Sequence, residues 1–367
     1  MKNQWSLPIG RFSGIQVYIH WTFMILLAWI LVMNYSAGHS LVEGGWSLLF
    51  VLTLFGCIVL HEFGHALTAR KFGIKTGDIT LYPIGGIASL ESMPEKPAQE
   101  LLVAIAGPTV NFTIAVLLWG YLRVSGTFPD LAALKDSATL QDQSFVFNLF
   151  AANLLLATFN LLPAFPMDGG RVLRALLAFR MDRAKATRVA ASVGQLLAIF
   201  LVFLGFSYDF WLVFIGLFVY LGAGGEAAFE TSRQILSPHT VRDAMMTKFS
   251  ALHPADPLGK AVELLLDGQD QEFLVIDQGK VVGILLRLDI IRGLAALGKA
   301  SPVEKAMQTE FLTLTPELAL KDIYPKLVAT KCSVFPVVEK GALVGVVDMD
   351  NIQELIWVNS VVPAAVS

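Results

Sequence analysis

The sequence predicts a polytopic α-helical membrane protein of about six transmembrane helices, with a membrane-associated β-hairpin and a soluble α/β tail. Hydrophobic residues make up 55% of the 367 residues and charged residues 16%, whereas typical soluble chains are about 25% charged. Several uncharged apolar runs are long enough to cross roughly 30 Å of hydrocarbon. From residue 237 onward the composition is that of a soluble domain.

The predicted spans fill a membrane domain of residues 1–228. They cover residues 15–33, 46–69, 101–122, 145–162, 190–206 and 210–227. Lysine and arginine concentrate in the segments on the side of the termini, so we expect a multi-pass protein of the cell membrane with both termini and the tail in the cytoplasm. His20, inside the first span, either bonds to a neighbouring helix near the interface or acts near the active site or its gate.

The segment between the second and third spans carries strand and turn signals. Ile79–Tyr82 and Ile87–Leu90 flank Pro83-Ile84-Gly85-Gly86, a pattern typical of a β-hairpin. Extended backbone at membrane depth is tolerated only against protein or a water-filled cavity, so we expect it to pack against the second span. An ordinary interfacial loop is the alternative.

The tail contains an internal repeat that follows a linker at residues 229–236. The two similar units occupy residues 237–298 and 299–360. Each reads as a helix, a strand, a glycine turn, a strand and a helix, at a period of about 60 residues. The tail is therefore predicted to be a tandem α/β domain.

The second span ends in a stretch that can bind a metal, His61-Glu62-Phe63-Gly64-His65. Two histidines four residues apart lie one turn apart on one face of a helix, so both imidazoles can reach one Zn²⁺. Glu62 is placed to act as a base on water at that metal. A structural polar cluster between helices is the alternative, but such groups are expensive in hydrocarbon. We therefore favour a functional metal site.

Asp168 is the best candidate for a third ligand, because a catalytic zinc takes three protein ligands and keeps one position open. It lies where the fourth span breaks, at the predicted cytoplasmic end, and nearby prolines and glycines free the backbone to turn its carboxylate inward. A helix N-cap is the alternative role. Asn111 and Asn160 each allow two interpretations, a contact to a substrate carbonyl or a hydrogen bond between helices.

Together these motifs resemble those of the site-2-type intramembrane zinc metalloproteases, in the prokaryotic subgroup with C-terminal tandem CBS domains. The matching stretches, in order, are HEFGH at 61–65, PIGG at 83–86, GPTVN at 107–111 and NLLPAFPMDGG at 160–170. The resemblance implies one Zn²⁺ per subunit held by His61, His65 and Asp168, with Glu62 as the catalytic base.

The same resemblance implies a zinc metalloendopeptidase (EC 3.4.24) for regulated intramembrane proteolysis. Its partners would be single-span membrane proteins, cut within or next to their transmembrane helices. The substrate would contact Asn111, Asn160, Pro83, Gly85 and Gly86. A CBS-regulated transporter and an inactive scaffold of the same fold are the competing interpretations.

The tail resembles a CBS pair, a module that often binds adenine nucleotides and often forms homodimers. Nucleotide-binding modules usually carry Ser or Thr three residues before a ribose-binding Asp. Here Asp289 is preceded by Leu286, and the second unit has Asp348 and Asn351 in the two places. An adenine nucleotide and a dimerising or structural role both stay open. The net charge of −3 gives no electrostatic case for nucleic acid.

Overall fold

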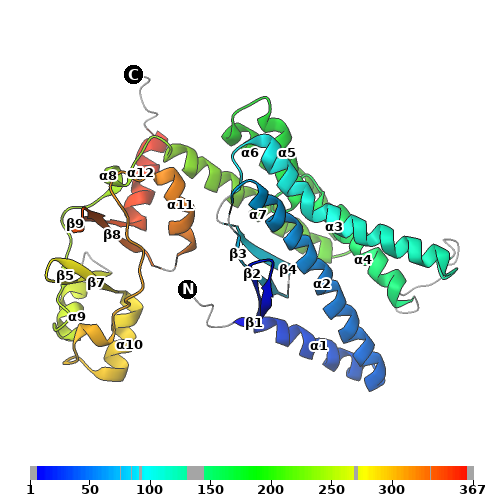
Figure 1. Ribbon diagram of the computed structural model, residues 1–367, viewed down its shortest axis with the longest axis horizontal. Helices are drawn as coiled ribbons and strands as arrows, with labels where there is room; N and C mark the ends of the chain where they lie inside the picture. Colours follow the sequence, from blue (N-terminus) through cyan, green and yellow to red (C-terminus); the bar gives the residue numbers. More distant parts are fainter. Residues whose placement is uncertain are drawn as a thin grey trace. The chain divides into compact units, whose positions relative to one another are not determined.

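The chain is divided into two compact units, Met1–Ala228 and Phe229–Ser367. The computed structural model describes residues 6–74, 76–83, 85–90, 93–129, 144–267, 272–330 and 332–361. Figure 1 shows a helical first unit with a small sheet, and a second unit that mixes short strands and helices. The two units are described separately.

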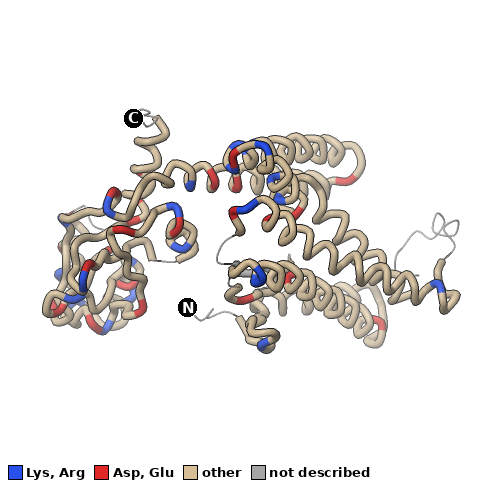
Figure 2. Tube along the Cα trace, turned by 45° about the horizontal axis from the view of Figure 1, so that its top comes forward, with Lys and Arg blue, Asp and Glu red and all other residues tan. Residues whose placement is uncertain are grey.

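The described residues of the first unit form seven helices, the last of which continues past Ala228. They are α1 (Thr22–Ser36), α2 (Leu41–Lys71), α3 (Pro97–Val124), α4 (Phe145–Asn160), α5 (Asp168–Ala178), α6 (Arg183–Ser207) and α7 (Trp211–Ile235). Among the described residues, α2, α3, α6 and α7 are long and apolar enough to cross a membrane, and α1 and α4 are shorter apolar helices. Charged residues are rare along these helices and frequent in the second unit (Figure 2). The protein is therefore a membrane protein.

The prediction of one span over residues 15–33 is wrong at its start. Residues 15–20 form a strand, and helix α1 begins at Thr22. In this strand apolar Ile15 and Val17 are buried and alternate with more polar neighbours, which is the period of a strand and not of a helix. His20 is the last residue of this strand, where it bonds to the Thr22 hydroxyl at 2.8 Å and stacks on Tyr82 with 4.8 Å between the ring centroids.

The sheet of the first unit has four strands in the order β1-β2-β3-β4. The strands are β1 (Ser6–Phe12), β2 (Ile15–His20), β3 (Thr76–Tyr82) and β4 (Gly85–Leu90). Strands β2 and β3 pair in parallel, and the two outer pairs are antiparallel. Ile15 and Ile79 pack on Ala66 and Phe63 of α2. The sheet therefore lies beside the HEFGH turns of that helix, and β4 is the last strand in the order of the sheet.

Helices α2 and α3 approach closely at a glycine in each helix. A Cβ at Gly64 would lie 2.8 Å from the carbonyl oxygen of Ala106. A Cβ at Gly107 would reach the imidazoles of His61 and His65. Small residues at such crossings let helix backbones meet inside membranes. The glycines of HEFGH and GPTVN thus bring α3 against the metal-binding face of α2.

The second unit contains two similar halves, as the repeat in the sequence predicts. The first has α8 (Val241–Ala244), β5 (Ala251–Leu252), α9 (Leu258–Leu266), β6 (Phe273–Asp277), β7 (Lys280–Leu285) and α10 (Arg287–Leu297). The second has a 3₁₀ turn (Val303–Lys305), α11 (Leu320–Ala329), β8 (Val334–Glu339), β9 (Ala342–Asp348) and α12 (Met349–Val361). Both hairpins turn through two residues with positive φ, Gln278-Gly279 and Lys340-Gly341, which suits a two-residue hairpin turn.

The halves exchange backbone hydrogen bonds in a reciprocal way. Met246, before the first sheet, pairs with Val346 in β9 at 2.8 and 2.9 Å. Gln308, at the equivalent place in the second half, pairs with Ile284 in β7 at 2.8 and 2.9 Å. Each half therefore extends the sheet of the other, and the pair forms one folding unit.

Candidate metal centre

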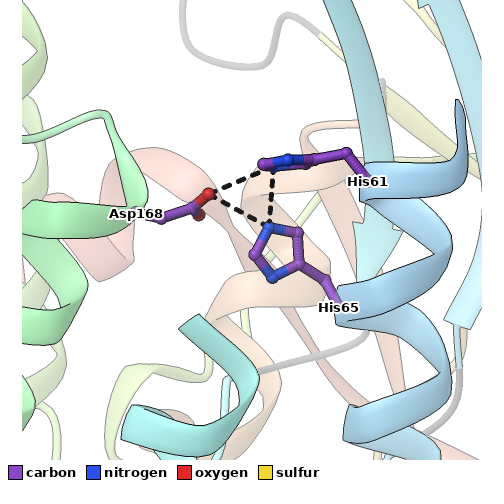
Figure 3. Close-up of side chains that lie close together, drawn as sticks. All are labelled: His61, His65 and Asp168. Carbon is purple, nitrogen blue, oxygen red and sulfur yellow. Dashed lines mark hydrogen bonds and ion pairs between the residues drawn. The ribbon is translucent and has the colours of Figure 1, made fainter. Parts of the chain in front are cut away.

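The two histidines of HEFGH point from one face of α2 to a common point (Figure 3). His61 is 6% exposed and His65 is 4% exposed. Their Nε2 atoms lie 3.1 Å apart. The helical spacing in the sequence thus produces the convergence that was predicted from it.

Asp168 reaches the same point from the first turn of α5 (Figure 3). Its Oδ2 lies 3.2 Å from Nε2 of His61 and 3.1 Å from Nε2 of His65. The N-cap of α5 is Met167, so the alternative role of Asp168 as N-cap is not observed. The carboxylate is free to face the histidines while it also sits favourably at the positive end of the helix dipole.

The two glycines after Asp168 explain how α5 packs so closely on the loop that follows α4. A Cβ at Gly169 would overlap the carbonyl oxygens of Leu161 and Leu162, and one at Gly170 would lie 2.6 Å from the backbone of Phe165. The first turn of α5 therefore packs directly on the loop that follows α4. Any larger side chain there would push the helix, and with it Asp168, away from α2.

The donor set fits Zn²⁺. Ligands of a tetrahedral zinc with bonds of about 2.0–2.1 Å lie roughly 3.3–3.4 Å apart, close to the observed separations of 3.1–3.2 Å. Among the described residues this is the one group of three His, Cys, Asp or Glu side chains close enough to hold a metal ion. A carboxylate and two imidazole nitrogens are ligands that zinc prefers.

Each imidazole is oriented by an acceptor on its far side. Nδ1 of His65 lies 2.7 Å from the carbonyl oxygen of Val103, and Nδ1 of His61 lies 2.5 Å from Oδ1 of Asn111. Because both oxygens only accept, each Nδ1 carries the proton and each Nε2 presents a lone pair. Three lone-pair atoms then converge, an arrangement that a cation between them stabilises.

Asn111 is 1% exposed, and both of its polar groups are engaged. Besides its contact to His61, its Nδ2 donates to Oδ1 of Asn153 at 2.9 Å. Of the two interpretations of Asn111, the structure shows the hydrogen bond between helices. Asn153 is a residue that the sequence reasoning missed, although an amide within the apolar fourth span was a signal that could have revealed it.

Glu62 is half-buried beside the donor triangle and lies under the start of β4. A Cβ at Gly86 would be 3.0 Å from Cγ of Glu62. Pro83 and Gly85 are half-buried at the same β3–β4 turn, and Ile84 lies outside the described residues. The structure thus brings the PIGG segment to Glu62. Asn160 is half-buried at the end of α4, where its Nδ2 donates to the carbonyl of Leu156 at 3.0 Å.

A buried ionic cluster holds α5 behind the metal centre. Arg174, 1% exposed, pairs with Glu100 of α3 and Glu226 of α7, each at 2.5 Å. Arg183 of α6 also pairs with Glu100, at 2.7 Å. The guanidinium of Arg174 lies 5.1 Å from the ring of Phe165. Sequence reasoning missed this cluster, because nothing in the chain indicates which distant charges meet.

The second unit has a cavity of about 120 Å³ lined by Glu272, Asp348 and Asp350, together with serines and apolar side chains. None of the described lining residues is basic, so nucleotide phosphates would meet carboxylates there without a partner. Asp289 is engaged elsewhere, because its Oδ2 accepts from Nε2 of Gln308 at 2.8 Å. The described residues of this cavity therefore offer nucleotide phosphates no cation.

The comparisons with known proteins agree with this geometry. Residues 49–140 and 123–204 match the model of peptidase family M50, and residues 241–296 and 303–357 match the CBS domain. A zinc metalloprotease of Methanocaldococcus jannaschii is 32% identical over 95% of each chain. A putative zinc metalloprotease of Synechocystis is 29% identical over 95% of this chain and 94% of its own.

A solved structure, titled as a site-2 protease from Methanocaldococcus jannaschii, is 35% identical to this chain and aligns with a TM-score of 0.44. The alignment covers 60% of this chain and 95% of that one. The family matches, the curated relatives and the donor set together define a membrane metalloprotease with a CBS pair. The chain belongs to peptidase family M50, the site-2 protease family.

Proposed function

We propose that this protein is a zinc-dependent endopeptidase of the EC 3.4.24 type, which hydrolyses peptide bonds within or next to transmembrane helices. The observation that carries the proposal is the triangle of His61, His65 and Asp168 donor atoms at 3.1–3.2 Å, with Glu62 beside it. Such a donor set leaves one position of a tetrahedral zinc open, as a catalytic site requires.

His61, His65 and Asp168 would hold one Zn²⁺ per subunit. The ion supplies Lewis acidity, which makes water a stronger acid and polarises a carbonyl oxygen. Glu62 takes a proton from the attacking water as its oxygen adds to the scissile carbonyl carbon. It then delivers that proton to the amide nitrogen as the C–N bond breaks.

Strand β4 is proposed to hold the substrate. A transmembrane helix satisfies its own amides, so it must unwind before its carbonyl carbon can be attacked. Strand β4 ends the order β1-β2-β3-β4, and its second residue, Gly86, lies next to Glu62. An unwound segment can pair with such an edge by strand addition. Asn160, at the end of α4 and before the helix α5 that carries Asp168, is also a candidate for substrate contact.

The topology is also a proposal. Six spans, with α1 and α4 as the two short ones, would put both termini and the CBS pair in the cytoplasm, as the lysine and arginine distribution favours. The β3–β4 pair would then lie at the cytoplasmic side of the membrane, and cleavage would fall near that end of a single-span substrate helix. The CBS pair would regulate this proteolysis or dimerise the enzyme.

Replacing Glu62 by Gln tests the proposal. The Glu62→Gln protein should keep about one zinc per chain and lose cleavage of a co-expressed single-span substrate, because the amide cannot accept the proton. His61→Ala should lose the zinc as well. Cleavage that survives in Glu62→Gln would refute the proposed role of Glu62, and a parent protein without zinc would refute the metal site.

A further inference from the structure

We infer that Asn153 is a positioning residue of the metal centre, which orients His61 through Asn111. The inference rests on the proposed zinc site and concerns a residue that touches neither the metal nor the substrate. Asn153 is 0% exposed in α4, and its side chain lies between α2 and α3. Its hydrogen bonds form one directed chain that ends at His61.

The direction of the chain is set at its far end by a backbone carbonyl. Nδ2 of Asn153 donates to the carbonyl oxygen of Leu149 at 2.9 Å and to Sγ of Cys57 at 3.5 Å. A carbonyl oxygen has no proton to give, so the amide nitrogen of Asn153 must face it. The oxygen of the same amide is therefore turned toward α3.

The next link transfers this orientation to Asn111. Oδ1 of Asn153 accepts from Nδ2 of Asn111 at 2.9 Å. The nitrogen of Asn111 thus faces Asn153, and its oxygen faces Nδ1 of His61 at 2.5 Å. If Asn111 were turned the other way, its NH₂ group would require an unprotonated Nδ1, and Nε2 of His61 would then carry the proton and could not bind a metal.

The two histidines thus reach the same tautomer by different means. His65 faces the backbone carbonyl of Val103 directly, and this acceptor cannot be reversed. His61 faces a side-chain amide, which is reversible by rotation unless something fixes it. Asn153 supplies that constraint. Groups that orient metal-binding histidines typically change metal affinity by about 10–100-fold when removed.

The variant Asn153→Leu tests the inference, because leucine keeps the volume and removes the acceptor. Zinc dissociation constants of the full-length protein in detergent are measured by competition with a chelator. Asn34→Leu is the matched control: Asn34 also donates to the carbonyl four residues back, at 2.9 Å, and accepts from a serine of the next helix, at 3.2 Å, but lies outside the metal centre.

Asn153→Leu should weaken zinc binding about 10-fold or more, and Asn34→Leu should leave it unchanged. The double variant Asn111→Leu/Asn153→Leu should bind zinc as Asn111→Leu alone does, because Asn153 acts only through Asn111. Thermal unfolding of the metal-free proteins distinguishes a positioning role from a purely structural one. A purely structural role of Asn153 would lower the stability of Asn153→Leu and leave its zinc affinity unchanged. If Asn153→Leu does not fold, Asn153→Ala is used for the same zinc measurement.

Parent-like zinc affinity in Asn153→Leu, or a full additional loss in the double variant, would overturn the inference. A parent protein that fails to bind zinc would instead refute the proposed function, so the two failures are distinguishable.

Discussion

Gly107→Ala is the sharpest test of the metal centre, because Gly107 is the point of α3 that faces both histidines. A Cβ there would lie 2.6 Å from Nε2 of His61 and would overlap Nε2 of His65. Ordinary contact begins at 3.4 Å, so the His61 nitrogen must retreat by about 0.8 Å, the difference between 3.4 and 2.6 Å. Metal–ligand distances in a zinc site are expected to lie within about 0.2 Å of their typical values, so a retreat of this size would take the His61 nitrogen out of bonding range.

The expected loss of zinc affinity follows from the free-energy cost of inserting one methyl group into a packed site. Overpacking costs about 1–3 kcal/mol, which corresponds to roughly 5–150-fold in the zinc dissociation constant when it acts on the ligands. Zinc affinity and cleavage are measured on the same preparation in detergent. Both should fall together in Gly107→Ala.

Gly120→Ala is the matched control on the same helix. A Cβ at Gly120 has no atom within 4 Å, so zinc binding and cleavage should be unchanged. The helix should gain up to about 0.5–1 kcal/mol, the usual benefit of alanine over glycine. If Gly107→Ala binds zinc and cleaves substrate like the control, the imidazoles do not lie where the structure has them.

Three further predictions concern other parts of the chain. Arg174→Leu should destabilise the first unit by about 3–5 kcal/mol, because it removes a buried guanidinium that pairs with two carboxylates and leaves buried Glu100 with Arg183 alone, whereas Lys185→Leu, at an exposed ion pair, should change detergent unfolding little. Gly86→Ala should slow cleavage with zinc content unchanged, because its Cβ would press on Cγ of Glu62. Burial and neighbouring carboxylates raise the pKa of Glu272 above 4.5. The folded tail therefore binds that proton more tightly than the unfolded chain, and its stability falls as pH rises from 4.5 through the raised pKa. Glu272→Gln should slow amide exchange of β6 at neutral pH but not below pH 4.5; an equal effect at both would contradict this.

The three residues of the donor triangle could be chosen from the sequence because the chemistry of a metal site restricts the choice of residue. A zinc site needs imidazole or carboxylate, and few such groups occur in the apolar spans, so Asp168 had few rivals. The spacing of His61 and His65 determined their common face. Residues 15–20 were misread because hydrophobicity alone does not separate a strand from a helix in a short run. The alternation of Ile15 and Val17 with more polar residues was the better signal.

The groups that hold the ligands in place could not be predicted in the same way. Whether Asn111 meets a substrate or Asn153 depends on the rotation of α3 and α4 about their axes, which uncharged apolar runs do not specify. Likewise, the partners of Arg174 come from residues 74 positions before it and 52 positions after it. Only the packed helices bring these side chains together.

The metal centre joins two elements that are each anchored separately from the metal. The glycine contact with α3 holds helix α2 in position. Helix α5 is held by the ion pairs of Arg174 and by the backbone packing at the glycines that follow Asp168. Moving Asp168 away from the histidines would therefore require either breaking a buried ion pair or losing the backbone packing of α5. Both are costly at low dielectric. The donor triangle is thus held by the packing of α2 on α3 and by the ion pairs and backbone contacts of α5.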